Sequence, residues 1–140
     1  MIRSLFVFLL FLTVSFSAIA REMTLPIGAV TDGDTIRSYL KLPCPLCSVS
    51  IRIIGIDTPE STYLARCAKE KELALQAKNV VKTLVAGQEY MQIYNFKWDK
   101  YGGRINAVVV VNGIDIGQEL INRGLAVPYT GSGPKHNWCN

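Results

Sequence analysis

Three residues that follow strand-like segments carry oxygen atoms that could hold a hard metal cation. Asp34 ends an Asp-Gly-Asp turn, and Asp57 and Thr58 directly follow a run rich in β-branched residues. Calcium takes about six to eight oxygen ligands, so two carboxylates and the Thr58 carbonyl, completed by water, would bind it and leave positions open for a substrate. Taken alone, the turn at 57–60 would also suit an ordinary acidic surface loop.

Two arginines could bind a phosphate in bidentate fashion, as the planar guanidinium group allows. Arg52 lies within the strand-like run, where a solvated residue on an exposed sheet face is the simpler interpretation. Arg104 follows two glycines, which let the backbone pass close to a ligand but would also suit a plain turn. In the same loop, Lys100 and Tyr101 could add a cation and an aromatic ring, or simply form an exposed turn.

This set of residues suits the hydrolysis of a phosphodiester bond. That reaction needs positive charge at the nonbridging oxygens and an activated water, and a metal with two arginines supplies both without a histidine. The chain has one histidine, His136, in a segment rich in glycine and proline. Nucleases that depend on a pair of catalytic histidines are therefore excluded, and we expect His136 to lie at the surface.

The elements that would position these residues follow from the hydrophobic pattern. Helical spacing of apolar residues predicts one long helix and one short helix, and β-branched or alternating runs predict five short strands, the first two of which should pair across the Asp-Gly turn. This order predicts an α+β fold, namely a five-stranded, partly open OB-fold barrel with one long inserted helix and one short helix. The expected strands are 24–30, 35–40, 49–56, 89–96 and 105–111, and the expected helices are 64–86 and 116–123.

Residues 1–20 have the pattern of a signal peptide. One Arg precedes an apolar run, and Ala-Ile-Ala at 18–20 is a small-x-small cleavage pattern. The run is short for a bilayer span, which leaves an uncleaved membrane anchor as the alternative. We therefore expect one domain at 21–140 that is secreted or periplasmic and has no stable membrane association after cleavage. Its small positive net charge is compatible with a polyanionic partner.

The chain contains four cysteines, an even number that favours disulfides in an exported protein. Three pairings are possible. Cys44 and Cys47 have the C-x-x-C spacing of redox and zinc sites, but the chain offers a single histidine and no second C-x-x-C. Structural disulfides are therefore the preferred interpretation, with the pairing left open by the spacing alone.

The motifs resemble, in order, the signatures of the staphylococcal nuclease-like, or thermonuclease, family. They cover most of the mature chain, and three active-site motifs spaced correctly around a helix are far more specific than one. The matching segments are Asp-Gly-Asp-Thr at 32–35, Ile-Arg-Ile-Ile-Gly-Ile-Asp-Thr-Pro-Glu at 51–60, Asp-Lys-Tyr-Gly-Gly-Arg at 99–104 and Gly-Leu-Ala at 124–126.

The resemblance implies a calcium-dependent nuclease that hydrolyses phosphodiester bonds in DNA or RNA and leaves 3′-phosphate products. It implies that two arginines grip the phosphate and that Glu60 activates or orients the attacking water. The implied site residues are Asp34, Asp57 and Thr58 as calcium ligands, Arg52, Glu60 and Arg104 as catalytic residues, and Lys100, Tyr101 and Tyr129 as substrate contacts.

Two departures from the family pattern affect these expectations. The third motif has an extra glycine before Arg104, which puts the placement of that arginine in doubt. The chain also ends soon after Gly124, where the staphylococcal enzyme continues into a helix. We expect a disulfide from Cys139 to Cys67 to replace that helix, which would leave Cys44 to pair with Cys47.

Two other functions remain possible at this point. A catalytically silent OB-fold protein could bind nucleic acid through charge and stacking without cutting it. An envelope protein could use a disulfide-stapled barrel only to contact other proteins, but this would leave the active set unexplained. A monomeric nuclease with nucleic acid as its partner is the preferred hypothesis.

Overall fold

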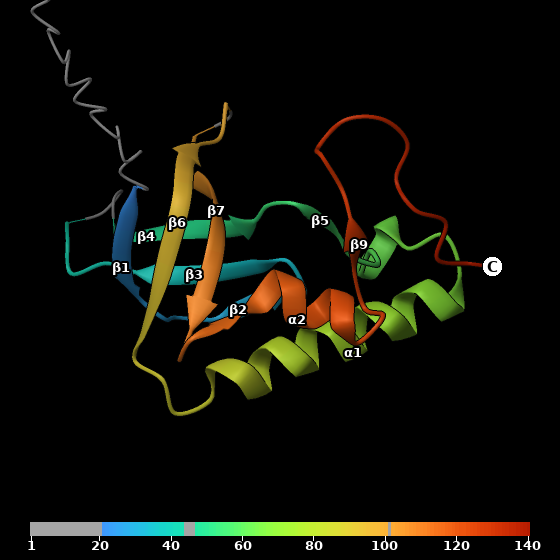
Figure 1. The fold of residues 1–140 in the computed structure, drawn as a ribbon, viewed down its shortest axis with the longest axis horizontal. Helices are drawn as coiled ribbons and strands as arrows, with labels where there is room; N and C mark the ends of the chain where they lie inside the picture. Colours follow the sequence, from blue (N-terminus) through green and yellow to red (C-terminus); the bar gives the residue numbers. More distant parts are fainter. Residues whose placement is uncertain (1–20, 44–46, 101) are drawn as a thin grey trace, which may run out of the picture.

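The computed structural model describes residues 21–43, 47–100 and 102–140. The expected signal peptide, Cys44 and Tyr101 lie outside these ranges. A curved mixed sheet forms the body of the protein, and two helices lie together at one side of it (Figure 1). The strands of the main sheet are β1 (Glu22–Pro26), β2 (Val30–Asp32), β3 (Thr35–Tyr39), β4 (Ser48–Ile53), β6 (Tyr90–Trp98), β7 (Arg104–Val111) and β8 (Ile114–Asp115).

The order in the main sheet is β1-β6-β7-β4-β3-β2, with β8 paired to β7. All neighbours are antiparallel except β4 and β7, which are parallel and place Arg52 opposite Asn106. A second sheet contains the short strands β5 (Ile56–Asp57) and β9 (Val127–Pro128). Together with the two helices, this mixed sheet forms the α+β, OB-type fold that the sequence predicts.

The predicted strand at 24–30 is divided into β1 and β2, and this division corrects one predicted pairing. Although β2 pairs with β3 as expected, β1 pairs with β6. Gly28 lies at the break, where a Cβ atom would come 2.5 Å from the Arg37 carbonyl oxygen and 2.6 Å from the Tyr39 ring. The chain can therefore change direction tightly against β3 only with glycine at this position.

A glycine also lies at the break after β4. The predicted strand at 49–56 breaks after Ile53, and Gly55 has a φ of +83°, a left-handed conformation that favours glycine. The chain then enters β5, which carries Asp57 and pairs with β9. The break thus moves Asp57 away from the sheet that holds Arg52 and toward the C-terminal segment.

The long helix α1 (Ala68–Val85) begins later than the predicted residue 64, because a short 3-10 helix, η1 (Thr62–Leu64), precedes it. Cys67 has an extended conformation, and its sulfur accepts a hydrogen bond from the Glu70 backbone N–H at 3.3 Å. Cys67 is therefore the N-cap of α1. The short helix α2 (Ile116–Asn122) is capped in the same way by Asp115, and both helices contact the sheet.

The core is filled by alternate residues of the central strands. In β7, Ile105, Ala107, Val109 and Val111 are buried, and in β4, Val49, Ile51 and Ile53 are buried. Because side chains alternate across a strand, the residues between them face outward. This alternation places Arg52, Arg104 and Asn106 together on the outer face of the parallel pair.

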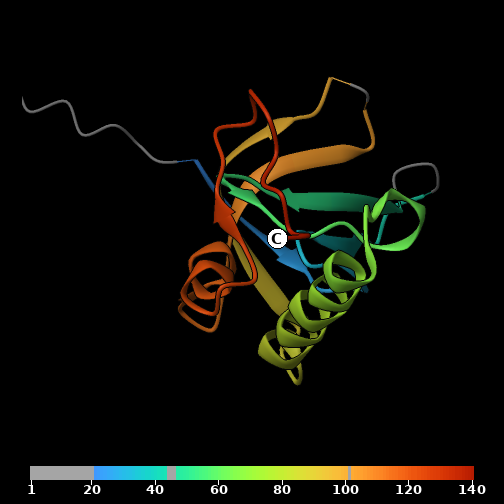
Figure 2. The ribbon, with the colours of Figure 1, turned by 90° about the vertical axis from the view of Figure 1, so that its right-hand side faces the viewer.

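The C-terminal segment rises as a loop after β9 and returns to the beginning of α1 (Figures 1 and 2). A disulfide between Cys67 and Cys139 fixes this return, with Cα atoms 6.0 Å apart. It is the first of the two expected disulfides. The second, Cys44 to Cys47, includes a residue outside the described ranges and stays a prediction.

We predict that replacing both Cys67 and Cys139 by Ser lowers the free energy of unfolding by about 3 to 5 kcal/mol, because the crosslink closes a long loop in the unfolded chain. Serine is a good N-cap, so the cap of α1 should survive this change. Urea unfolding followed by tryptophan fluorescence measures the effect. The same midpoint for the variant and the oxidised parent would contradict the prediction.

Candidate active site

An open cleft of about 680 Å³ lies over the outer face of β4 and β7. The parallel register brings Arg52 and Arg104 to the same face, and both line the cleft. Two lysines and an aromatic ring add to these arginines, and because Asp99 is the one acid among the described lining residues, the lining is net positive and suits an anionic chain. The residues that contribute these groups are Arg52, Lys97, Arg104, Tyr129 and Lys135.

Arg52 is held by a carboxylate. Its Nη2 atom lies 2.9 Å from Oδ2 of Asp34, whose other oxygen accepts a hydrogen bond from the Thr35 hydroxyl at 2.8 Å. Asp34 is buried, and its backbone carbonyl accepts a hydrogen bond from the Ile53 N–H. The ion pair fixes the guanidinium at the edge of the cleft while leaving about one third of the side chain exposed (33%).

Arg104 is held in the same manner by a different acid. Its Nε and Nη2 atoms lie 3.2 and 2.7 Å from Oδ2 of Asp99, and Asn106 donates to the same oxygen at 3.3 Å. Gly102 and Gly103 both have positive φ, +73° and +65°. The two glycines thus form the turn before β7, and Arg104 begins this strand two positions before Asn106, which pairs with Arg52.

The turn that carries the remaining acids lies beside this cleft. Asp57 and Thr58 are buried, with 3% and 6% of their surface exposed, whereas Glu60 is partly exposed. These three residues line a smaller cavity of about 260 Å³. Lys135 lines both the cavity and the cleft, so the two spaces meet at its side chain.

Lys135 is the functional candidate that sequence reasoning missed. Its ammonium group forms an ion pair with Glu60 and lies 3.6 Å from Oδ1 of Asp57, while the His136 backbone N–H donates to Oδ2 of Asp57 at 3.0 Å. The His136 side chain is exposed, as predicted. The expected disulfide between Cys67 and Cys139 could have identified Lys135, because this disulfide brings the C-terminal segment close to Asp57.

The pKa of Lys135 reflects these contacts. Partial burial opposes its charge and the nearby Arg52 repels it, but the hydrogen bond that Lys135 donates to Glu60 and the negative charges of Glu60 and Asp57 outweigh both effects. The pKa of Lys135 is therefore raised above its usual value, and the side chain is charged at neutral pH.

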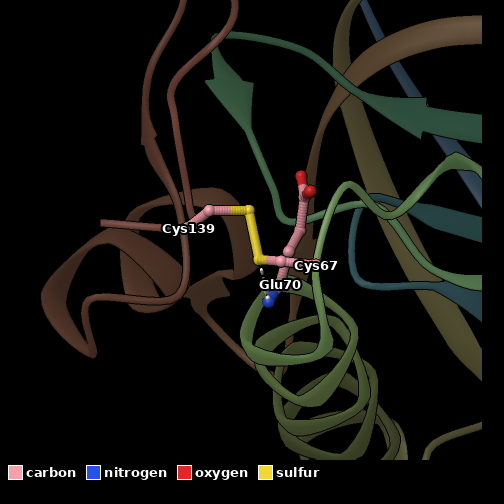
Figure 3. A group of neighbouring side chains, drawn as sticks. All are labelled: Cys67, Glu70 and Cys139. Atoms are coloured by element: carbon pink, nitrogen blue, oxygen red, sulfur yellow. Dashed lines mark hydrogen bonds between the residues drawn. A yellow bond between two sulfur atoms is a disulfide. The ribbon is translucent and has the colours of Figure 1, made fainter.

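The predicted calcium ligands have the right chemistry but are occupied by protein cations. Asp34 and Asp57 are buried carboxylates, and each is paired with a basic side chain. Over the described part of the chain, the one group of three acidic, His or Cys residues with ligand atoms within 4.8 Å of one another is Cys67, Glu70 and Cys139. Figure 3 shows the two sulfur atoms joined, which removes them as ligands. A cation bound to Asp57 would therefore compete with Lys135, and a cation bound to Asp34 would share that carboxylate with Arg52.

The two predicted substrate contacts within the described ranges, Tyr129 and Lys100, differ in their position relative to the cleft. Tyr129 lines the cleft, and its hydroxyl donates to the Gly133 carbonyl at 3.0 Å. Lys100 is described but does not line the cleft, and Tyr101 lies outside the described ranges.

Glu70 is hydrogen-bonded to the backbone of the acidic turn and of the segment that follows it. Its buried carboxylate accepts hydrogen bonds from the backbone N–H groups of Glu60 at 3.4 Å and of Arg66 at 2.7 Å, and from the Arg66 guanidinium. Burial raises its pKa, but these hydrogen bonds and the charge of Arg66 outweigh burial, and the pKa of Glu70 is lowered from its usual value. Glu70 therefore links the start of α1 to the turn at 57–60.

The protein is an OB-type barrel that carries two anchored arginines beside buried carboxylates. Guanidinium groups held in this way have the chemistry to bind a phosphate. The profile of the family described as staphylococcal nuclease homologue matches residues 50–138, and the chain belongs to this family. The resemblance seen in the sequence motifs is therefore confirmed.

Two similar proteins are described as endonucleases. The chain is 30% identical over 140 residues to a Schizosaccharomyces pombe protein described as a probable endonuclease, an alignment that covers 74% of this chain and 54% of the relative. It is also 30% identical over 100 residues to an Escherichia coli O157:H7 protein described as an uncharacterized endonuclease, covering 71% of this chain and 57% of the relative. The chain thus spans a little over half the length of these relatives.

We predict that Glu70→Gln destabilises the protein at neutral pH and that the difference narrows in acid. Because the folded pKa is lowered, the charged carboxylate stabilises the fold above the usual glutamate pKa, and this stabilisation is lost as the pH falls through the folded pKa. Urea unfolding midpoints at pH 7 and pH 3 measure this. Glu72→Gln, an exposed glutamate on the same helix, is the control for net charge. Equal pH dependence in both variants would contradict the prediction.

Proposed function

We propose that this protein is an exported, calcium-dependent nuclease that hydrolyses phosphodiester bonds of DNA, RNA or both and leaves 3′-phosphate products. The observation that carries the proposal is the pair Arg52 and Arg104, each anchored by a carboxylate and both lining one cleft beside the acidic turn. Membership of the nuclease family and the descriptions of the relatives support it.

The two arginines would act on the phosphate. A phosphodiester gains negative charge on its nonbridging oxygens when water attacks phosphorus, and guanidinium groups held in advance stabilise that charge without reorganising. Their N–H groups are arranged as forks that match two phosphate oxygens. Asp34 and Asp99 supply the orientation, and the exposed third of each guanidinium side chain remains available to the substrate.

Glu60 would accept a proton from the attacking water as the bond from phosphorus to the 5′ oxygen breaks. The 5′ oxygen would leave as a hydroxyl after taking a proton from solvent, and the phosphate would stay on the 3′ side. Asp34, Asp57 and the Thr58 carbonyl would hold calcium, which supplies positive charge and Lewis acidity beside the phosphate when bound. In the structure, the Glu60 carboxylate is paired with Lys135. Its availability as a base therefore depends on the position of that lysine.

The remainder of the cleft suits a nucleic acid strand. Lys97 and Lys135 add positive charge along the lining, and the Tyr129 ring could stack on a base. A catalytically silent binding protein would use the same charge and ring. The anchored arginines and the acidic turn favour the enzyme, because binding a strand alone does not require this catalytic set.

Export and the monomeric state are part of the proposal. The pattern of residues 1–20 and a disulfide between distant cysteines both suit an oxidising compartment, either the periplasm or the exterior. Within the described ranges, no helix has both the length and the apolar character needed to cross a membrane.

We predict that Arg52→Ala and Arg104→Ala each lower the rate of DNA cleavage by about 10²- to 10³-fold, because each removes a donor to the developing charge. Initial rates of plasmid nicking in calcium give the measurement. Arg37→Ala, an exposed arginine on β3, is the matched control and should cut at the parent rate. If the parent shifts DNA in a gel but never cuts it, the silent binding protein is the correct alternative.

We predict different behaviour for the two acids of the turn. Asp57→Asn should weaken calcium binding, so part of the lost rate should return at high calcium and magnesium should substitute poorly. Glu60→Gln should lose about 10²- to 10⁴-fold in rate even at saturating calcium, because the amide cannot accept a proton. Cleavage rates across calcium and magnesium titrations measure both. Full recovery of Glu60→Gln at high calcium would assign Glu60 to coordination.

A further inference from the structure

The segment at 129–139, here called the tail segment, is fixed at both ends. At its start, the Tyr129 N–H donates to the Gly55 carbonyl at 2.9 Å. At its end, the disulfide joins Cys139 to Cys67, the N-cap of α1, and the Arg66 guanidinium donates to the His136 carbonyl. Figure 3 shows Cys139 drawn against the first turn of α1.

Between these anchors, the tail segment supplies donors to both acids of the turn. Lys135 approaches Oδ1 of Asp57 and pairs with Oε1 of Glu60, while the His136 N–H binds Oδ2 of Asp57. Both oxygens of Asp57 are thus engaged by the tail segment. This arrangement neutralises a carboxylate that is almost completely buried, with 3% of its surface exposed.

A divalent cation would need the oxygen that Lys135 approaches. The ammonium group and such a cation repel each other strongly at short distance, particularly where burial lowers the effective dielectric constant. The lysine must therefore move when a cation binds, and the work of breaking its ion pairs reduces the net affinity for the cation.

We propose that Lys135 is a tethered counter-cation that sets the affinity of the Asp57 site for divalent cations, and that the Cys67–Cys139 disulfide keeps it in place. This inference rests on the proposed function in assuming that Asp57 is a ligand for the cation. Because Lys135 lines the cleft as well as the smaller cavity, its displaced side chain has space among the arginines. Displacement also frees the Glu60 carboxylate, so cation binding and release of the base occur together.

Calcium binding to the oxidised mature protein tests this directly. Calorimetry should show that Lys135→Met binds calcium about twofold to fivefold more tightly than the parent, which is the change expected when a competing, partly exposed ion pair is removed. Lys97→Met is the matched control, because it removes the same charge from the same cleft, while the ion pairs that Asp57 and Glu60 form within the described ranges are with Lys135. Its affinity should stay close to that of the parent.

The tether is tested with the Cys67→Ser/Cys139→Ser variant. Its calcium affinity should rise toward that of Lys135→Met, and adding Lys135→Met to it should give little further gain, because both changes remove the same competitor. Melting temperatures provide a second measurement. Lys135→Met should melt below Lys97→Met in chelator, since Asp57 loses its partner, and the difference should close in calcium.

The outcomes separate this inference from the proposed function. If the parent cleaves DNA in calcium but Lys135→Met binds calcium no more tightly, the inference fails and the proposed function stands. If Lys135→Met gains affinity while the parent and the variant both leave DNA intact, the inference stands and the nuclease proposal fails. An equal gain in Lys97→Met would also overturn the inference, and absence of calcium binding in every variant would overturn both.

Discussion

The buried negative charge of Asp57 is the constraint on which this part of the molecule depends. A carboxylate so far from water is costly unless a cation or hydrogen-bond donors compensate it. The break at Gly55 moves Asp57 into β5, which pairs with β9 and so brings the following segment close. Lys135 and the His136 N–H then provide the compensation. The disulfide and the irregular C-terminal segment thus have an electrostatic purpose beside their mechanical one.

The two arginines of the cleft follow the same rule, because each is paired with a carboxylate. Arg52 is held by Asp34 and Arg104 by Asp99. The parallel pairing of β4 with β7 determines that both guanidinium groups face the same space. The inner faces of these strands are filled with aliphatic side chains, so the two arginines lie on a well-packed sheet. Unlike ordinary surface arginines, they are held in a fixed orientation by their carboxylate partners.

Much of this arrangement could be predicted from the sequence because its signals are local. The β-branched run predicted the strand that carries Arg52, and the Asp-Gly turn predicted the pairing of β2 with β3. The partner of β1 could not be predicted, since it depends on the close contact of Gly28 with Tyr39. Lys135 was missed because its segment has no periodicity and its position depends on a disulfide between residues separated by 72 positions.

The double role of Cys67 affects the order in which the protein can assemble. Cys139 is synthesised after every strand of the sheet, and closing so long a loop is slow until native contacts have brought its ends together. The helix cap needs only neighbouring residues, whereas the crosslink needs the whole fold and an oxidant. The contacts of the sheet and of α1 therefore do not include the crosslink, whereas the closed end of the site is completed only where an oxidant is available.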